Sequence, residues 1–344
     1  MFILLAITMK KKILLATMAF IILLAGFFAW KFFGPAVSVN QESYLFIKTG
    51  SSYEDVQKEL TRNGFIGGNI WFGMASKIIG YKKVKPGRYK LSDGMSMTSL
   101  VRLLNNGQQT PVNFVITKIR TKETLADKIG NAFECDSLQM IDFLNDPDSL
   151  KPYGLDTNTV MAVAMPFTYD IKWNTTPSRI FQQFYTAYKT FWSEERKQKA
   201  DSLKLTPLEV SVLASIIDEE TNAAVDRPDI ASVYLNRIKK GMPLQADPTL
   251  KFALKNFGLK RVLNEHKNVA SPYNTYINKG LPPGPICTPQ LETIDAVLNS
   301  PQTDYLYFVA NSDFSGTHIF TTNYEDHMKY ARLYQEELNK RNIK

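Results

Sequence analysis

The sequence predicts a mixed α+β fold in which an N-terminal membrane-spanning helix precedes an α/β module and a larger mixed α/β region. Three observations lead to this class. An uncharged apolar run covers 13–30, strand-like runs alternate with capped helical segments over 44–133, and an apolar helix begins at Thr206. The remainder of the chain is long enough for two or three domains. We expect an anchor with its cytoplasmic tip over 1–34, the α/β module over 40–110, an intermediate α/β region over 111–205 and a C-terminal region over 206–344.

The apolar run is expected to anchor the chain in the inner or plasma membrane as a single-pass helix. Lys10, Lys11 and Lys12 precede it, and Lys31 follows it. Its length suffices to cross a bilayer and exceeds a typical signal-peptide core, and no convincing small-x-small cleavage site follows it. Because basic residues favour the cytoplasmic side, we expect the N-terminus inside and everything after about Gly34 outside the cytoplasm. A cleaved signal peptide is the alternative.

Helix and strand signals alternate after the anchor. The expected elements are a strand over 44–48, a helix opened by Ser51-x-x-Glu54 and closed near Gly64, a turn at Pro86-Gly87, a strand over 89–91, a helix over 96–106 stopped by Gly107, and a second strand-and-helix phrase over 112–133. A long helix within 153–200 carries many aromatic residues at helical spacing. Such a stripe is more typical of a core than of a binding surface.

Glu220 is the strongest candidate in the sequence for a chemically active side chain. Thr206 supplies an N-cap and Glu209 can close a capping box, so the start of the helix is well defined. At about 100° per residue, Glu220 falls in register with Leu213 on the apolar stripe, whereas Asp218 lands on the opposite face. An unpaired buried carboxylate takes a raised pKa, which suits a general acid near neutral pH. The alternatives are a structural salt bridge to Arg227 or Arg237, or a helix that ends before Glu220.

Composition and motifs argue against several other function classes. The formal charge of +8 suits an anionic membrane or wall polymer, but the lysines are dispersed and no groove-reading motif occurs, so we do not expect nucleic acid as a partner. The three histidines lack zinc-ligand spacing, and neither a phosphate-binding loop nor a nucleophile elbow occurs. We therefore expect neither a metal nor a cofactor. Cys135 and Cys287 are expected to be free, buried thiols.

A stretch from Leu213 to Leu250 resembles the endolytic murein transglycosylase family, also called MltG or YceG-like. It reads LASIIDEETNAAVDRPDIASVYLNRIKKGMPLQADPTL. In that family a helix that ends in a Glu-Thr pair carries the catalytic glutamate. The matching elements are Glu220-Thr221, the Ala231–Arg237 helix, the Leu244–Thr249 turn, the Tyr273–Tyr276 and Gly280–Ile286 loops, the Tyr305–Ala310 run, His318 and Asn323. They follow the family's order, and the resemblance spans nearly the whole chain.

The resemblance implies a catalytic role for Glu220 and a LysM-like, glycan-binding module over 40–110, for which a plain α/β spacer is the alternative. It also implies sugar contacts for eight other side chains: Asn236, Gln245, Asp247, Tyr273, Asn274, Tyr276, Thr168 and Tyr169. Two of these have structural interpretations as well. Asp247 would be the N-cap of a helix that runs to Phe257, and the Asn236 amide would bond a neighbouring carbonyl. The chain departs from the family at Phe167, where an aspartate is usual.

The resemblance further implies the reaction. A lytic transglycosylase cleaves the MurNAc-GlcNAc β-1,4 bond, and the muramic acid 6-hydroxyl attacks its own anomeric carbon to leave a 1,6-anhydro end. One carboxylate then suffices, first as acid and then as base. Such an enzyme would cut within nascent glycan strands and terminate their elongation, with cell-wall synthases as candidate partners. Two alternatives stay open: a hydrolytic muramidase with Asp247 as the second carboxylate, and a non-enzymatic wall-binding scaffold.

Overall fold

Helix α1 (Phe2–Phe33) opens the chain in the computed structural model, which describes residues 2–259 and 261–341. From Met9 to Phe33 this helix is long and apolar enough to span a membrane. Its last turn belongs to the core of the folded part that follows, because Phe32 is buried and Thr98 Oγ1 donates a hydrogen bond of 3.1 Å to the Phe32 carbonyl. The predicted anchor is therefore joined to the next module without a flexible linker.

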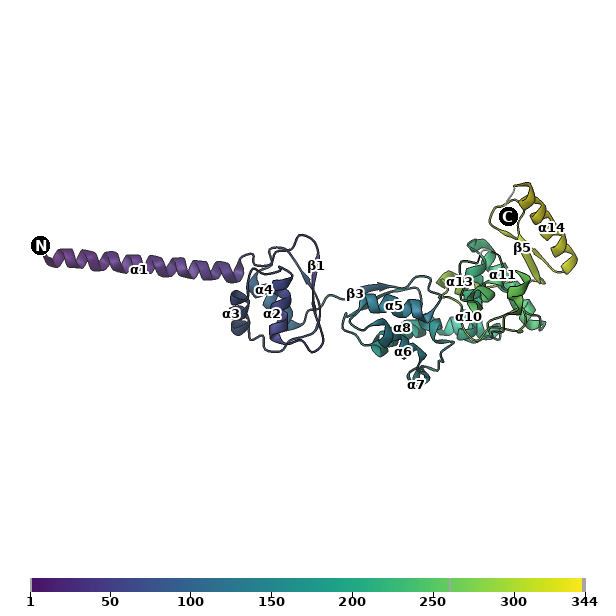
Figure 1. Cartoon of the computed structure of the whole chain (residues 1–344), viewed down its shortest axis with the longest axis horizontal. Coiled ribbons are helices and arrows are strands. Elements are labelled where there is room, and N and C mark those ends of the chain that lie inside the picture. Colours follow the sequence, from purple (N-terminus) through teal and green to yellow (C-terminus); the bar gives the residue numbers. More distant parts are fainter. Residues whose placement is uncertain (1, 260, 342–344) are drawn as a thin grey trace. The chain divides into compact units, whose positions relative to one another are not determined.

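The described residues form two compact units (Figure 1). The first runs up to Val112 and includes Asp170–Thr175, and the second holds Asn113–Tyr169 together with the chain from Thr176 onwards. Both units combine helices with short strands, so the predicted mixed α+β class is confirmed. The intermediate and C-terminal regions of the sequence analysis both contribute to the second unit.

The first unit consists of a two-stranded antiparallel sheet packed with helices. Its elements are β1 (Ser43–Ile47), α2 (Tyr53–Arg62), α3 (Asn69–Ile79), β2 (Gly87–Leu91) and α4 (Met97–Asn106). Strands β1 and β2 pair with Leu45 opposite Tyr89, and both side chains are buried. They share one core with Phe72 of α3 and Leu100 of α4. The long segment between the two strands is thus held in place by helices that pack on one apolar core.

Two details of this unit differ from the sequence-based expectation. Helix α2 is capped by Ser52, whose hydroxyl accepts from the Asp55 amide while the Asp55 carboxylate accepts from the Ser52 amide at 2.9 Å, so the capping box lies one residue later than predicted. Helix α3 was not predicted. It lacks a side-chain N-cap, and apolar residues lie on both its buried and its exposed faces, so its sequence shows no simple amphipathic stripe.

The second unit begins with a helical layer around a short sheet. Strand β3 (Val112–Val115), which belongs to this unit from Asn113, pairs with β4 (Thr168–Ile171), which belongs to it up to Tyr169. The helices and turns of this layer are α5 (Lys122–Ala132), α6 (Ser137–Asn145), α7 (Pro147–Leu150), the 3₁₀ turns η1 (Lys151–Tyr153) and η2 (Val160–Val163), α8 (Pro177–Phe191) and α9 (Glu194–Ser202). The aromatic residues of α8 are largely buried, including Phe181, Phe184 and Tyr188. The predicted core role of this stripe is confirmed.

The rest of the second unit is built around helix α10 (Pro207–Glu220). The elements that follow it are η3 (Ala224–Asp226), α11 (Arg227–Lys239), α12 (Asp247–Ala253), η4 (Asn264–Asn268), α13 (Leu291–Leu298), the antiparallel pair β5 (Tyr307–Ala310) and β6 (His318–Thr321), and α14 (Tyr324–Lys340). Helix α10 packs against α11, α12 and α13. Cys135 and Cys287 are free and buried, as predicted.

Helices α10 and α12 each correct part of the sequence analysis. The Thr206–Glu209 capping box of α10 is present, but every residue from Val210 to Asp218 is buried, so the helix has no polar face. Asp247 is the first residue of α12 rather than its N-cap, a position held by Ala246. This helix also ends at Ala253, earlier than predicted, because the backbone turns to a positive φ of 52° at Lys255.

Candidate active site

Glu220 is the last residue of α10, where the buried helix reaches the surface. As a residue it is partly exposed, whereas Asp218 two residues earlier is only 3% exposed. The helix stops there because Thr221 takes an extended conformation with φ −141° and ψ 141°. The capping box at one end and the close packing along its length therefore fix the carboxylate at the other end.

Helix α11 supplies the direct partner of this carboxylate. The Tyr234 hydroxyl donates a hydrogen bond of 2.6 Å to Glu220 Oε1, and Tyr234 is only 1% exposed. Arg237 lies three residues later and so on the same side of the helix. Its guanidinium donates hydrogen bonds of 2.7 Å to the carbonyls of Leu306 and Leu244, which hold its charge in place.

A second carboxylate stands close enough to influence Glu220 electrostatically. Asp247, at the start of α12, accepts a hydrogen bond of 2.5 Å from the Tyr276 hydroxyl. Its negative charge raises the pKa of Glu220, while Lys251, one turn later on the same helix, lowers it. The site therefore combines the end of α10 with side chains from α11, α12 and the loop that carries Tyr276.

The net result is a glutamic acid that titrates near neutrality. Burial is the largest cause and raises the pKa of Glu220 from its ordinary value of 4.5 to about 7, against the opposing hydrogen bond from Tyr234. In the part of the chain that the structure describes, neither Arg227 nor Arg237 forms an ion pair with Glu220. The salt-bridge alternative is therefore not the arrangement present.

The two preceding carboxylates have different surroundings. Asp218 accepts a hydrogen bond of 2.8 Å from Thr293 and lies 3.6 Å from Arg227. Glu219 pairs with Arg120 at 2.9 Å and Lys118 at 3.0 Å, and these bonds lower its pKa despite partial burial. Both are bound to fixed cations or donors, so neither is suited to donate a proton to a substrate.

Two of the predicted sugar-binding residues are used to hold the protein's own backbone. The Asn236 amide donates to the Thr303 carbonyl at 2.8 Å and the Tyr305 carbonyl at 3.0 Å. Asn274 is fully buried, and its amide donates at 2.9 Å to the carbonyls of Lys267 and Val269. These bonds position α11 and the Tyr276 loop around Glu220.

Gln245 and Tyr273 are more accessible. Gln245 is exposed and has a positive φ of 56°, and its backbone N–H donates a hydrogen bond of 3.0 Å to the Thr275 carbonyl, which ties it to the Tyr276 loop. The Tyr273 ring lies 4.7 Å from that of Phe252 and lines a cavity of about 160 Å³ together with Arg120 and other residues. Both side chains remain available to a ligand.

Thr168 and Tyr169, two further predicted sugar contacts, lie on strand β4. Thr168 is exposed, whereas Tyr169 is 6% exposed and its hydroxyl donates to the Met165 carbonyl at 3.0 Å. The Phe167 ring packs against the rings of Tyr169 and Phe191. Phe167 therefore extends an aromatic cluster at the position where the family commonly has an aspartate.

Sequence reasoning did not single out Tyr234 or Lys251 as parts of the site. Their positions are consistent with helical spacing, since Tyr234 precedes Arg237 by three residues and Lys251 follows Asp247 by four. The sequence alone does not show the tertiary packing that brings α11 and α12 to the end of α10. Among the described residues, no group of three His, Cys, Asp or Glu side chains is arranged to hold a metal ion.

Comparison with known proteins agrees with the resemblance seen in the sequence. Residues 45–333 match the model of the YceG-like family. The chain belongs to this family. The endolytic murein transglycosylase of Bacillus subtilis (strain 168) is 32% identical to this YceG-like protein over 316 residues, which cover 86% of this chain and 85% of that one. The endolytic murein transglycosylase of Streptococcus pneumoniae serotype 2 is 27% identical over 355 residues, 92% of this chain and 64% of that one.

A solved structure supports the same assignment. The crystal structure of a putative YceG-like protein from Listeria monocytogenes is similar with a TM-score of 0.56 and 29% sequence identity. The similarity covers 85% of this chain and 99% of the Listeria chain. The YceG-like fold therefore extends over both units of this protein.

Proposed function

We propose that this YceG-like protein is a membrane-anchored endolytic lytic transglycosylase of peptidoglycan, with Glu220 as its acid and base. The observation that carries the proposal is a partly exposed glutamic acid whose pKa is raised to about 7 at the end of a buried helix. The substrate class is supported by the relatives named endolytic murein transglycosylase. The apolar helix α1 supports attachment to the membrane.

In the first step the protonated Glu220 carboxyl donates its proton to the oxygen of the glycosidic bond between MurNAc and GlcNAc. The bond from the anomeric carbon to that oxygen breaks, and GlcNAc leaves with a free 4-hydroxyl. Tyr234 holds Glu220 Oε1, so the other carboxyl oxygen is the one directed to the substrate. A carboxyl with a pKa near 7 can both hold the proton before the reaction and release it during the reaction.

In the second step the 6-hydroxyl oxygen of the same muramic acid bonds to the anomeric carbon, and the Glu220 carboxylate takes the hydroxyl proton. The product is a 1,6-anhydroMurNAc end, and Glu220 is again protonated. Positive charge develops at the anomeric carbon between the two steps. We assign the stabilisation of that charge to the Asp247 carboxylate, and its hydrogen bond from Tyr276, which holds it in position, supports this role.

The remaining predicted contacts divide into two roles. Gln245, Tyr273 and Tyr276 are the side chains we assign to glycan binding, because they are exposed or partly exposed and lie beside α12. Asn236 and Asn274 are positioning residues that act through the backbone they bond. Thr168 is a further candidate for a sugar contact, while Tyr169 serves the core.

We further propose that the N-terminus is cytoplasmic and that both folded units lie on the outer side of the inner or plasma membrane. The basic cluster at Lys10, Lys11 and Lys12 supports this orientation. An anchored enzyme next to the membrane would meet glycan strands as they are made, so it would cut them internally and terminate their elongation. Cell-wall synthases are the partners that this placement suggests.

Hydrolysis is the second candidate reaction, and one observation favours it. Asp247 lies close enough to raise the pKa of Glu220, so the site contains two carboxylates, as hydrolytic muramidases do. In that reaction Asp247 would act as nucleophile or would activate a water molecule. The two reactions leave different ends on the muramic acid.

The decisive experiment compares the purified protein with Glu220→Gln on intact glycan strands. Glu220→Gln keeps the shape of the side chain but cannot donate the proton, so cleavage should fall by at least about 100-fold. Glu219→Gln is the matched control, because it removes the adjacent carboxylate without touching Glu220, and it should retain most activity per folded molecule. If the Glu220→Gln variant digests glycan as well as the wild type does, the enzymatic proposal is refuted and the scaffold alternative remains.

Product analysis in heavy-oxygen water separates the two reactions. The lyase should leave unlabelled 1,6-anhydro ends, lighter by one water molecule than hydrolysed ends, and it should shorten long strands from within. Label at the reducing MurNAc would show that water is the nucleophile. That result would move the protein to the muramidases, with Asp247 as the second carboxylate.

A further inference from the structure

Helix α3 exposes an apolar row on the surface of the first unit. Ile70 is 76% exposed, Ile78 is 73% exposed, and Met74 between them is 37% exposed. The spacing of four residues places all three along one side of the helix, opposite Phe72 and Ala75, which are buried in the core. A contiguous exposed apolar row of this kind is typical of an interaction surface.

This row lies beside the end of the membrane-spanning helix. The Trp71 ring of α3 meets the rings of Phe27, Phe28 and Phe32 of α1 at 5.8, 5.6 and 5.9 Å between centroids. Figure 1 shows α3 on the edge of the unit from which α1 extends, with β1 toward the opposite edge. Helix α3 therefore lies at the edge of the unit from which α1 extends toward the membrane that it would cross.

The length of α1 sets the level of α3 relative to the bilayer. The uncharged run over 13–30 covers about 27 Å at 1.5 Å per residue, close to the hydrocarbon thickness of about 30 Å. Phe27 and Phe28 thus lie within about one helical turn of the outer boundary. Trp71, which packs on both, lies at the same level, where tryptophan is commonly found in membrane proteins.

The charges around α3 suit anionic headgroups. Between Thr61 and Leu91 the sequence contains seven basic and no acidic side chains. Lys77 lies on α3, and Lys82 and Lys83 follow it closely, all three exposed to solvent. An apolar row beside exposed lysines is the pattern of a helix that lies in the membrane interface.

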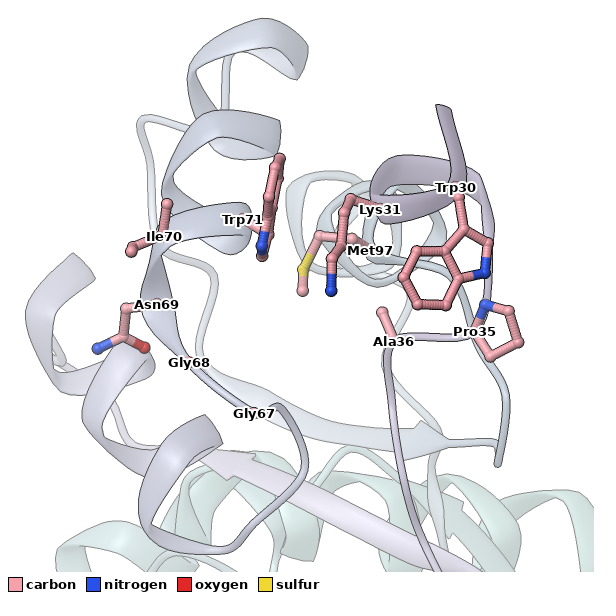
Figure 2. A pocket seen from close by; sticks show the side chains of 10 residues that line it. All are labelled: Trp30, Lys31, Pro35, Ala36, Gly67, Gly68, Asn69, Ile70, Trp71 and Met97. Carbon is pink, nitrogen blue, oxygen red and sulfur yellow. The ribbon is translucent and has the colours of Figure 1, made fainter. Parts of the chain in front are cut away.

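A cavity of about 430 Å³ separates the end of α1 from the start of α3 (Figure 2). Lys31 stands between Trp30 and Trp71 in this opening, and its Nζ lies 4.7 and 5.9 Å from their ring centroids. Across from it, Gly67 and Gly68 leave the opposite wall without side chains. No acidic side chain in the described part of the chain pairs with Lys31, so its ammonium is available to a lipid phosphate.

From these contacts we infer that α3 is a membrane-docking helix. Ile70, Met74 and Ile78 enter the outer boundary of the bilayer that α1 spans, and Lys31 and Lys77 bind the phosphates of anionic phospholipids. The docked helix fixes the orientation of the first unit against the membrane surface. The inference rests on the membrane anchoring included in the proposed function.

The test uses the full-length chain in lipid nanodiscs of equal parts phosphatidylglycerol and phosphatidylcholine. A fluorescent label is placed on Met74→Cys, and quenching by lipids with a nitroxide near the headgroup is measured. Lys48→Cys, an exposed position just after β1, is the matched control, and the unsubstituted chain with its buried thiols is the labelling blank. Quenching at residue 74 should exceed that at residue 48 by at least about twofold.

Two further sets of quenching measurements test which side chains and which lipids make the contact. Adding Ile70→Asn and Ile78→Asn should lower quenching at residue 74 to the control level without changing the circular dichroism spectrum, because both positions are exposed. Discs of phosphatidylcholine alone should weaken the quenching. Equal quenching at residues 74 and 48, or no effect of anionic lipid, would overturn the inference. Quenching that requires two chains per disc would also overturn it, and would assign the surface to a second copy.

The same samples separate this inference from the proposed function. A chain that enters the discs and cleaves glycan, but shows no quenching at residue 74, refutes only the docking of α3. A chain that fails to enter the discs refutes the anchor itself. A chain that enters the discs, shows the quenching, and leaves glycan intact refutes only the enzymatic proposal.

Discussion

At the scale of single residues, three consecutive carboxylates show how strongly the environment decides chemistry. Asp218 is buried and bonded to Thr293, Glu219 is paired with Lys118 and Arg120, and Glu220 accepts its hydrogen bond from a neutral phenol, that of Tyr234. The cations beside Glu219 lower its pKa. Around Glu220, burial outweighs the hydrogen bond and favours the protonated acid.

This difference predicts the pH dependence of cleavage. The acid step needs protonated Glu220, whose pKa is raised to about 7, so kcat/KM should fall about tenfold per pH unit on the alkaline side of neutrality. A pH profile of glycan cleavage by the free enzyme measures this limb. A profile that stays flat from pH 6 to about 9 would exclude Glu220 as the group that must be protonated.

Tyr234 should influence the pH at which kcat/KM begins to fall on the alkaline side. Its hydroxyl donates to Glu220 Oε1 and thereby lowers the pKa of Glu220. Tyr234→Phe removes the bond and keeps the ring, so the alkaline limb should move to higher pH, with a loss of about 1 kcal/mol of stability. A purely structural role would lower activity equally at every pH, and comparison of the two complete profiles distinguishes these outcomes.

Glu220 should also make folding stability depend on pH. Because its pKa in the folded state lies above the ordinary 4.5, ionisation opposes folding, and stability is lost as the pH rises from about 4.5 to about 7. Glu220→Gln cannot ionise, so its melting temperature should exceed that of wild type at pH 8 and match it more closely at pH 5. Differential scanning calorimetry at the two pH values checks the sign; a gap that is larger at pH 5 would contradict it.

At the scale of elements, α10 is a helix buried on every face rather than an amphipathic one. Asp218 is therefore part of the core, and its side chain faces Thr293, Arg227 and Lys118. Asp218→Asn leaves these cations without their buried partner and should cost about 3 kcal/mol of unfolding free energy. Chemical denaturation measures the loss, with Asp229→Asn on α11 as a control expected within about 0.5 kcal/mol of wild type.

Features of the fold with local causes could be predicted from the sequence, and features that depend on tertiary packing could not. The capping box of Thr206 and Glu209 and the stop at Gly107 depend on neighbouring residues, and both are present in the structure. Helix α3 could not be predicted from periodicity, since one of its apolar faces is buried and the other is exposed. The bond from Tyr234 to Glu220 was likewise invisible, because it depends on how α11 packs against α10.

The choice of Glu220 as the candidate acid rested in part on a helical pattern that the structure corrects. The helical wheel placed it at the centre of an apolar stripe, whereas the structure places it at the end of a helix that is buried all round. The raised pKa arises from the packing of α11 and α12 around that end. The resemblance to the family motif, which marks the Glu-Thr pair, supports the choice of Glu220 without relying on amphipathicity.

At the scale of the whole molecule, the charge distribution around α1 predicts topology. Lys10, Lys11 and Lys12 lie on one side of the uncharged run, and the module that holds Phe32 in its core lies on the other. Because basic clusters stay in the cytoplasm, both folded units should be outside it. A reporter that is active only outside the cytoplasm, fused after Lys344, should be active.

Protease accessibility provides the complementary measurement. In intact spheroplasts, external protease should remove both units and leave only a short fragment that contains α1, while a cytoplasmic marker stays whole. Changing Lys10, Lys11 and Lys12 to glutamine should reduce the fraction of chains in this orientation, because it removes most of the charge asymmetry that directs insertion. If the full-length chain is protected in intact spheroplasts and is digested only after lysis, the units face the cytoplasm, where they could not reach a peptidoglycan strand.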